Sequence, residues 1–358
     1  TPRVISCAED LPDHIGLPRG CRDELLSLLN EHGVTLDVED RANDDAPLDV
    51  AFHGTLTAVQ KAVVRQLQPH DSGVLVAPPG AGKTIIGIHL IGARGRNTLV
   101  LVHRAQLLEQ WRAQLAVFLQ IDPKLIGQIG AGKRKVTGTV DVAMIQSLAR
   151  RDGADDLVAG YGHVVVDECH HVPAVSFERV MREVRARYVT GLTATPNRRD
   201  GHEPIIELQL GPVRASIDSR RDAARRPFEH RVVVRETAFR LSGEAENQGI
   251  QAIYQSLARD EIRNDLIVED VARSLSEGRS PIVLTERRDH LDTIATRLAS
   301  VARHVIVLSG GMGVKGRRDV NEALVETAST EGRVIVATGR FIGEGFDDAR
   351  LDTLFLAM

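Results

Sequence analysis

The chain contains few aromatic residues and few cysteines, and each shortage excludes a class of site. Aromatic side chains make up 3% of the 358 residues, which argues against a binding surface built mainly on base-stacking platforms. Its three cysteines, Cys7, Cys21 and Cys169, are too scattered for a disulfide framework, and no two have the close spacing of a zinc knuckle. This usage fits a reduced setting, so we expect a cytoplasmic, intracellular protein.

Long apolar segments are also missing. No run approaches the length of a membrane span, and no charged-then-apolar signal segment opens the chain, so we expect no membrane contact. The net charge of −4 is close to neutral, and attraction to nucleic acid would have to come from local basic patches. The last residues, Leu354–Met358, still have the pattern of a buried strand, so we expect the fold to continue beyond them.

The chain does contain a repeated alternation of short apolar runs and amphipathic segments, which begins near Phe52. Its length exceeds one comfortable core and favours two domains with a small appendage. Alternating strands and helices predict an α/β fold with parallel sheets covered on both faces. We predict strands at Gly73–Ala77, Asn97–Val102, Val140–Met144, His163–Val166, Arg187–Leu192, Pro281–Leu284, His304–Leu308, Arg333–Ala337 and Leu351–Leu356. The predicted helices are Asp23–Asn30, Thr84–Gly92, Ala105–Leu119, Asp289–Val301, Arg317–Ala328 and a long one over Ile250–Glu277 that breaks near Arg259–Asp260.

Charge is concentrated in three stretches outside these elements. Arginines are dense over Gly211–Arg240, where a solvated segment between domains and a nucleic-acid contact explain them equally well. Residues Lys133–Lys135 form a small basic loop, for which a solvated loop is favoured over a DNA contact. The acidic, turn-rich stretch Glu39–Asp45 has the composition of a linker.

A glycine-rich segment lies between the first predicted strand of the alternation and the helix after it. Its sequence, Ala77-Pro-Pro-Gly-Ala-Gly-Lys-Thr84, matches the P-loop pattern G-x-x-x-x-G-K-[ST], with Ala77 in place of the first glycine. Such a loop turns backbone N–H groups toward a phosphate at the start of a helix. We predict that Lys83 binds the β- and γ-phosphates and that Thr84 is a ligand of Mg²⁺. The remaining nucleotide-binding positions of the loop are Pro79, Gly80, Ala81 and Gly82.

Two adjacent carboxylates follow a second apolar run, in His163-Val-Val-Val-Asp-Glu-Cys-His170. The three valines predict a buried strand, with Asp167 and Glu168 at its carboxyl-terminal tip, where ligands bind in open α/β sheets. Asp167 would hold Mg²⁺ through its water shell, and Glu168 would orient and polarise the attacking water. A solvated turn is the plainer alternative, and the P-loop weakens it by supplying the missing phosphate and metal partners. We therefore predict catalytic roles for Lys83, Asp167 and Glu168.

These segments, and others in the same order along the chain, resemble the motifs of superfamily 2 helicases. The tetrad Asp167-Glu-Cys-His170 is similar to motif II of the DExH class. The spellings are most similar to the subgroup that contains the repair helicase XPB and the motor subunits of type III restriction enzymes. The further matches are Val102–Trp111 with motif Ia, Ala143–Ser147 with motif Ib/Ic, Gly191–Pro196 with motif III, Ile282–Arg287 with motif IV and Ala337–Asp347 with motif V.

The resemblance covers about Phe52 to Met358 and implies two tandem RecA-like P-loop NTPase domains, the second truncated, after a small N-terminal extension. The implied division is a small adaptor and acidic linker at 1–50, a first RecA-like domain at 51–228, an interdomain segment and helix at 229–275, and a partial second domain at 276–358. Together with the motor, residues 1–50 faintly resemble bacterial helicases of mobile-element conflict systems, which implies a bacterial origin. They are also a candidate surface for a protein partner.

The resemblance also implies roles for individual residues. Gln60, in Leu56-Thr-Ala-Val-Gln60, would read the adenine edge. Further nucleotide contacts would come from Gly345 and Asp347. The implied nucleic-acid contacts, mainly to phosphates, are His103, Arg104, Gln146, Thr338 and Arg340. The implied residues that couple the ATP site to the nucleic-acid path are His170, Thr193 and Thr195.

One motif of the family, the arginine-bearing motif VI, would follow the last residue of this chain. An arginine that reaches the γ-phosphate contributes about 10³–10⁵ in rate in other NTPases. We therefore expect this stretch of chain to bind ATP and Mg²⁺ but to hydrolyse ATP slowly, which brisk DNA-stimulated turnover would contradict.

The expected function is an ATP-dependent helicase or translocase that couples hydrolysis to movement along DNA, with double-stranded DNA favoured over RNA. ATP and Mg²⁺ are the expected cofactors. Two alternatives stay open: a P-loop ATPase with no nucleic-acid role, and an ATP-regulated DNA clamp without strand separation, as in the motor subunit of a restriction or defence complex.

Overall fold

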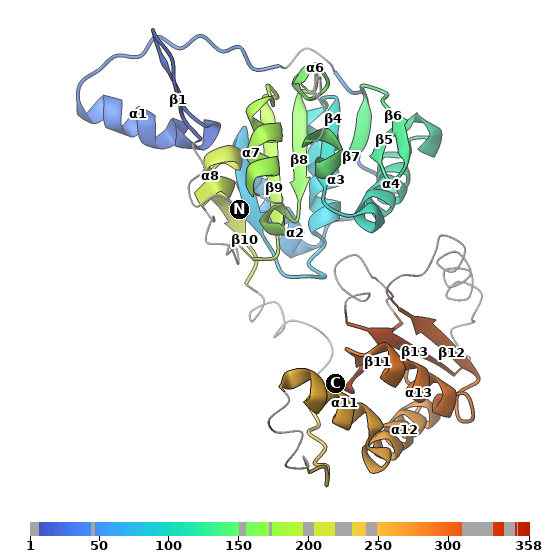
Figure 1. The fold of residues 1–358 in the computed structure, drawn as a ribbon. Helices are drawn as coiled ribbons and strands as arrows, with labels where there is room; N and C mark the ends of the chain where they lie inside the picture. Colours follow the sequence, from blue (N-terminus) through green and yellow to red (C-terminus); the bar gives the residue numbers. More distant parts are fainter. Residues whose placement is uncertain are drawn as a thin grey trace. The chain divides into compact units, whose positions relative to one another are not determined.

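The computed structural model of the chain describes residues 7–43, 47–149, 155–171, 174–195, 204–218, 231–240, 249–309, 332–339, 348 and 350–358. The chain divides into two compact units, Thr1–Glu229 and His230–Met358 (Figure 1). In the described parts of both units, no helix is long and apolar enough to cross a membrane.

Unit one is built on an eight-stranded sheet in the order β10-β3-β9-β8-β4-β7-β5-β6. The strands from β10 to β5 run parallel, and the edge strand β6 pairs antiparallel with β5. Because the strands on either side of β8 are parallel to it, their carboxyl ends meet at one edge, which is where such sheets bind ligands. The strands are β3 (Ser72–Val76), β4 (Thr98–Val102), β5 (Ile126–Gly130), β6 (Lys133–Lys135), β7 (Val140–Met144), β8 (His163–Asp167), β9 (Tyr188–Thr193) and β10 (Val213–Ser216).

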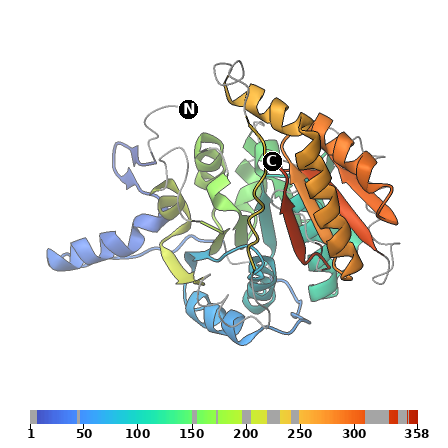
Figure 2. The same ribbon diagram turned by 90° about the horizontal axis from the view of Figure 1, so that it is seen from below.

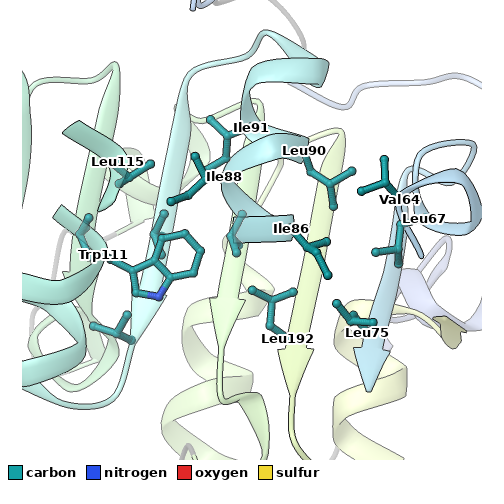
Figure 3. Close-up of a cluster of buried hydrophobic side chains, with 14 of the residues drawn as sticks. Val64, Leu67, Leu75, Ile86, Ile88, Leu90, Ile91, Trp111, Leu115 and Leu192 are labelled. Carbon is teal, nitrogen blue, oxygen red and sulfur yellow. The ribbon is translucent and has the colours of Figure 1, made fainter. Parts of the chain in front are cut away.

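Helices cover both faces of this sheet, each over its own apolar cluster (Figures 1 and 3). Trp111 and Leu115 lie one turn apart and are fully buried on one face, and each large apolar side chain buried in this way contributes about 1.5–3 kcal/mol. The helices of that face are α2 (Ala58–Leu67), α3 (Lys83–Arg94) and α4 (Ala105–Leu119). The helices of the opposite face are α5 (Ile145–Ala149), α6 (Asp155–Ala159), α7 (Ala174–Arg182) and α8 (Pro204–Leu210).

The N-terminal segment is held to unit one by a few polar contacts. It contains the hairpin of β1 (Glu9–Asp10) and β2 (Ile15–Gly16), the short 3-10 helix η1 (Arg19–Cys21) and helix α1 (Arg22–Glu31). The guanidinium of Arg19 donates to the carbonyls of Ala186 and Val184 at 3.0 and 2.5 Å. Helix α1 buries none of its residues.

Unit two contains a four-stranded parallel sheet in the order β12-β13-β11-β14. Figure 2 shows helices α12 and α13 side by side against it. Asp260 separates α11 from α12 because its side chain accepts a hydrogen bond from the backbone N–H of Arg263 at 2.7 Å and so caps α12. The elements are α11 (Ile250–Arg259), α12 (Glu261–Ser276), β11 (Pro281–Thr285), α13 (Arg288–Leu298), β12 (His304–Leu308), β13 (Arg333–Thr338) and β14 (Thr353–Leu356).

Most predicted elements are confirmed within a residue or two, and Ala105–Leu119, Val140–Met144 and His304–Leu308 have the predicted bounds. The predicted loop at Lys133–Lys135 is wrong, since these residues form the edge strand β6. Strand β5 was not predicted, because its sequence Ile-Gly-Gln-Ile-Gly combines apolar residues with two glycines. The predicted helix Arg317–Ala328 lies outside the described residues. The predicted divisions near residues 50 and 275 stay predictions.

Candidate nucleotide and nucleic-acid site

The P-loop joins β3 to α3 at the carboxyl edge of the first sheet. Gly80 and Gly82 both have a left-handed backbone, with φ of 79° and 82°, a region that costs a residue with a side chain about 1–2 kcal/mol. A Cβ at Gly82 would lie 2.3 Å from Nε2 of Gln60, whereas a Cβ at Gly80 would meet nothing within 4 Å. Helix α3 begins at Lys83, so the unpaired N–H groups of its first turn lie at this loop.

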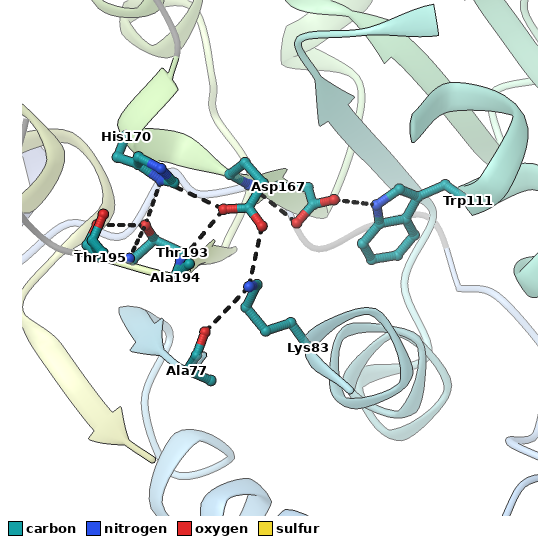
Figure 4. Close-up of polar contacts among 9 residues, drawn as sticks. Ala77, Lys83, Trp111, Asp167, His170, Thr193, Ala194 and Thr195 are labelled. Carbon is teal, nitrogen blue, oxygen red and sulfur yellow. Dashed lines mark hydrogen bonds and ion pairs between the residues drawn. The ribbon is translucent and has the colours of Figure 1, made fainter. Parts of the chain in front are cut away.

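Lys83 contacts the carboxylate that follows β8 (Figure 4). Its Nζ lies 3.1 Å from Oε1 of Glu168 and donates to the carbonyl of Ala77, also at 3.1 Å. Both Lys83 and Glu168 are 8% exposed, and a buried pair offsets its desolvation only when further hydrogen bonds hold it. Glu168 has a left-handed backbone with φ of 47°, so the turn after β8 presents this carboxylate to the P-loop lysine. The predicted catalytic pair is therefore in direct contact.

Asp167, the last residue of β8, is held from both sides. The indole N–H of Trp111 donates to its Oδ2 at 2.7 Å, and the backbone N–H of Glu168 donates to its Oδ1 at 3.0 Å. Burial raises the pKa of Asp167 to about 6; the Trp111 hydrogen bond and the Lys83 charge oppose this rise, and the Glu168 charge adds to it. Asp167 therefore lies beside Glu168 in a fixed orientation.

A short polar chain connects Glu168 to the end of β9. Oγ1 of Thr193 lies 2.7 Å from Nδ1 of His170 and donates its own hydrogen to the carbonyl of Thr195 at 2.7 Å. Because that hydrogen is used, Nδ1 of His170 is the donor to Thr193. Nδ1 also lies 3.5 Å from Oε2 of Glu168, which accepts from the backbone N–H of Ala194 at 3.4 Å. The three residues predicted to couple the sites thus form a chain of contacts in which Thr195 bonds to Thr193, Thr193 to His170, and His170 lies against Glu168 (Figure 4).

Gln60 lies beside the P-loop. Its Oε1 accepts from the backbone N–H of Thr57 at 2.9 Å, as the second half of the capping box that starts α2. Its Nε2 donates to the carbonyl of Ala81 at 3.1 Å. The predicted adenine contact is therefore next to the phosphate loop, and its side chain supports that loop.

The predicted nucleic-acid contacts of unit one lie at the same edge of the sheet. His103 and Arg104 follow β4, and Gln146 is in α5, after β7. The side-chain amide of Gln146 donates to the carbonyl of His103 at 3.0 Å. Arg104 is exposed. Because β4 and β7 are neighbours, the structure brings these three predicted contacts together.

The remaining predicted contacts belong to unit two. Thr338 ends β13 and is paired in register with Thr285 of β11. The carbonyl of Thr285 accepts from the backbone N–H of Gly339 at 3.2 Å. Arg340, Gly345 and Asp347 lie outside the described residues, and their roles stay predictions.

Trp111 is the site residue that sequence reasoning did not assign. It is the only tryptophan of the chain and is fully buried on α4. A buried indole usually finds a partner for its N–H, and that requirement is the signal in the sequence. Its partner, Asp167, could not be named without the strand order that places α4 over β8.

Comparisons with known proteins agree with these motifs. Residues 53–198 match the family described as "Type III restriction enzyme, res subunit". Among curated relatives, "DNA 3'-5' translocase XPB2" of Sulfurisphaera tokodaii is 27% identical over 179 residues, which are 50% of this chain and 39% of that protein. "DNA 3'-5' helicase XPB" of Mycobacterium tuberculosis is 33% identical over 149 residues, or 40% of this chain and 27% of that protein. The chain thus spans less than half the length of these relatives.

Over at most half of its length, the chain is therefore similar to helicases of the XPB and type III restriction type. The predicted fold class is confirmed. The crystal structure of the Pyrococcus furiosus Hef helicase domain matches with a TM-score of 0.52 at 16% identity, over 83% of this chain and 88% of that one. At this identity the likeness shows the fold alone, which is the α/β architecture with parallel sheets described above.

Proposed function

We propose that this chain is the motor of an ATP-dependent DNA helicase or translocase, which couples ATP hydrolysis to movement along DNA. One observation carries the proposal: Glu168 contacts both Lys83 of the P-loop and His170, which contacts Thr193. A change at the phosphate site would therefore reach the end of β9 through direct contacts. The XPB-type relatives, named as a DNA translocase and a DNA helicase, support the same function.

The residues fit a nucleotide with Mg²⁺. The left-handed glycines leave the loop backbone open to a phosphate, and Thr84 follows Lys83 in the first turn of α3. In the described part of the chain, no three histidine, cysteine or acidic side chains group into a metal site of their own. Mg²⁺ in such motors does not need one, since one or two protein ligands, water and the phosphates complete its octahedron. Thr84 and Asp167 are the proposed ligands.

The protein groups have separate tasks in this scheme. Lys83 exchanges its contact with Glu168 for the β- and γ-phosphates, and so frees the carboxylate of Glu168 to orient the attacking water and accept its proton. When bound, Mg²⁺ neutralises charge on the phosphate oxygens. Trp111 keeps Asp167 in one orientation, and the Ala194 N–H with His170 keeps Glu168 in place.

DNA contact is proposed mainly through phosphates, which positions a motor without reading sequence. Arg104, exposed beside His103 and Gln146, is the strongest candidate in unit one, and Thr338 is the described candidate in unit two. The low aromatic content fits a protein that follows the backbone rather than stacking on bases.

The test is a steady-state ATPase assay of the full-length protein with no nucleic acid, duplex DNA, single-stranded DNA and RNA. We expect duplex DNA to stimulate turnover, Lys83→Ala to abolish nucleotide binding, and Glu168→Gln to keep binding while lowering turnover by about 10²–10⁴. Lys61→Ala, an exposed lysine on α2, is the matched control and should behave as wild type. Turnover that ignores every nucleic acid would favour a P-loop ATPase with another role, and unchanged turnover in Glu168→Gln would remove the assigned catalytic role.

A further inference from the structure

The hairpin of β5 and β6 forms one edge of the first sheet. Gly130 is paired with Lys133, which leaves Ala131 and Gly132 as a two-residue loop. Their φ angles are 51° and 81°, and positive φ at both positions is the mark of a type I′ turn, the tight turn that matches the twist of a hairpin. The tip is therefore a short, well-defined turn.

This tip lies at the same edge of the sheet as the proposed DNA contacts of unit one. Strand β5 runs parallel to β7, so its carboxyl end, where the turn begins, is at the ligand-binding edge of the sheet. A Cβ at Gly130 would lie 2.8 Å from Cγ of Met144, the last residue of β7. Gln146 is two residues further, and its amide holds the carbonyl of His103 at the end of β4. Along this edge the order of loops is thus β8, β4, β7 and the hairpin tip (Figure 1).

The hairpin is strongly basic although the protein as a whole is not. Lys133, Arg134 and Lys135 are all exposed, and no acidic residue occurs between Asp122 and Asp141. Lys135 donates to the carbonyl of Lys124, which lies before the amino end of β5. Lys133 and Arg134 are nearer to the turn. Two cations therefore lie next to the tip, in a protein whose net charge is −4.

The base of the hairpin is braced against α4, the helix that contains most of motif Ia. Nε2 of Gln128 in β5 donates to Oε1 of Glu109 in α4 at 3.2 Å. The other oxygen of Glu109 pairs with Arg112 at 3.3 Å, so this nearby carboxylate already has partners. Helix α4 starts directly after Arg104. The brace fixes the hairpin relative to the Arg104 loop, and a fixed pair of contacts loses little entropy on binding.

We propose that the hairpin tip, through Lys133 and Arg134, is a further contact for the phosphate backbone of DNA. The tip lies one strand beyond β7, on the side away from β4, and so extends the set of contacts formed by Arg104, His103 and Gln146. This inference rests on the proposed function, because it requires DNA to lie along the same edge. The sequence favoured a solvated basic loop at these residues. The structure instead has a tight turn with two cations next to it, beside the loops of motifs Ia and Ib.

Lysine on an edge strand has a second use, because its charge discourages pairing with another chain. The two roles differ in what they require. Protection from pairing needs charge anywhere along β6, whereas a phosphate contact needs it near the turn. Lys124 is the matched control: it is exposed and lies at the opposite end of β5, away from the ligand-binding edge.

The experiment measures binding of the full-length protein to a fluorescent DNA duplex at a series of salt concentrations. Each lost phosphate contact lowers the slope of log K against log salt by about 0.9. We expect Lys133→Ala to lower the slope by about 0.9, Lys133→Ala with Arg134→Ala by about 1.8, and Lys124→Ala to leave it unchanged. Thermal unfolding and a sedimentation run on each variant check that the fold and the oligomeric state are intact.

The outcomes separate the two proposals. Wild-type protein that binds no DNA at low salt contradicts the proposed function itself. Wild-type binding with equal slopes in all three variants overturns the hairpin contact alone. Self-association of the double variant with an unchanged slope also overturns it, because the charges would then serve only to protect the edge strand.

Discussion

The indole N–H of Trp111 donates a 2.7 Å hydrogen bond to Oδ2 of Asp167, so the only tryptophan of the chain orients the carboxylate proposed to hold Mg²⁺. Both side chains are buried. Trp111 is in α4, at the end of the motif Ia match, and Asp167 ends β8. The bond thus joins the segment next to the proposed DNA path to the segment next to the proposed nucleotide.

Replacing Trp111 by phenylalanine tests this relationship. The ring stays apolar but the N–H is lost, and Asp167 keeps the single donor from Glu168. We expect the Mg²⁺ concentration for half-maximal ATPase to rise by roughly 10-fold, as for other partners that orient metal ligands. Leu115→Ala, one turn along the same helix and equally buried, should lower the unfolding temperature without moving the Mg²⁺ dependence. An unchanged Mg²⁺ dependence in Trp111→Phe would reduce Trp111 to a core residue.

The two P-loop glycines should differ in their tolerance of alanine. Both have positive φ, but a side chain at Gly82 would also lie 2.3 Å from Nε2 of Gln60, while Gly80 has open space. We expect Gly82→Ala to weaken nucleotide binding by more than about 10-fold. Gly80→Ala should lose only the backbone preference of about 1–2 kcal/mol. Isothermal titration with an ATP analogue measures both, and equal losses would show that the contact with Gln60 is unimportant.

Thr193 should matter for coupling more than for ATP binding. Thr193→Val keeps the shape of the side chain but removes the hydroxyl that contacts His170 and the Thr195 carbonyl. We expect nucleotide affinity to change by no more than about 5-fold, since a threonine hydroxyl contributes only about 1 kcal/mol per bond, while DNA stimulation of the ATPase falls. Thr190→Val, in the same strand but bonded to Arg94, is the control. Equal stimulation in both variants would contradict the coupling role.

His290 should make unit two less stable in acid. Burial, followed by the charge of Arg263, lowers the pKa of this histidine to about 4. Nε2 lies 2.9 Å from Oδ1 of Asn264, and Nδ1 lies 2.8 Å from Oγ1 of Thr285. Because Oδ1 only accepts, the neutral ring donates from Nε2 and accepts from Thr285.

The sign of the effect follows from the lowered pKa. Above pH ~6.5 the ring is neutral in both folded and unfolded chains; below it the unfolded chain binds a proton that the folded chain refuses. Stability is therefore lost as the pH falls from about 6.5 to 4, by at most ~3 kcal/mol and by less where water screens the ring. Urea unfolding at several pH values should show a steeper loss for wild type than for His290→Gln. Parallel pH profiles would contradict the assignment.

Local sequence patterns predicted the elements that carry the site. The run Val164–Val166 with Asp167 and Glu168 after it predicted a buried strand ending in two carboxylates, and β8 confirms it. The amphipathic pattern of Ala105–Leu119, with apolar residues at helical spacing, predicted α4. Strand β6 was mispredicted because three consecutive charged residues hide the period-two pattern of a strand, and only pairing with β5 makes it one.

The sequence by itself therefore determined which residues form the P-loop, the DExH tetrad and the strands that bear them, because strand and helix periodicity and the needs of phosphate binding act over a few neighbouring residues. Only the tertiary structure decided which of these residues meet. Lys83 contacts Glu168 because β9 alone separates β3 from β8, and Trp111 reaches Asp167 because α4 packs over that sheet. These contacts depend on strand order and helix packing, which join residues far apart along the chain and leave no local pattern in it.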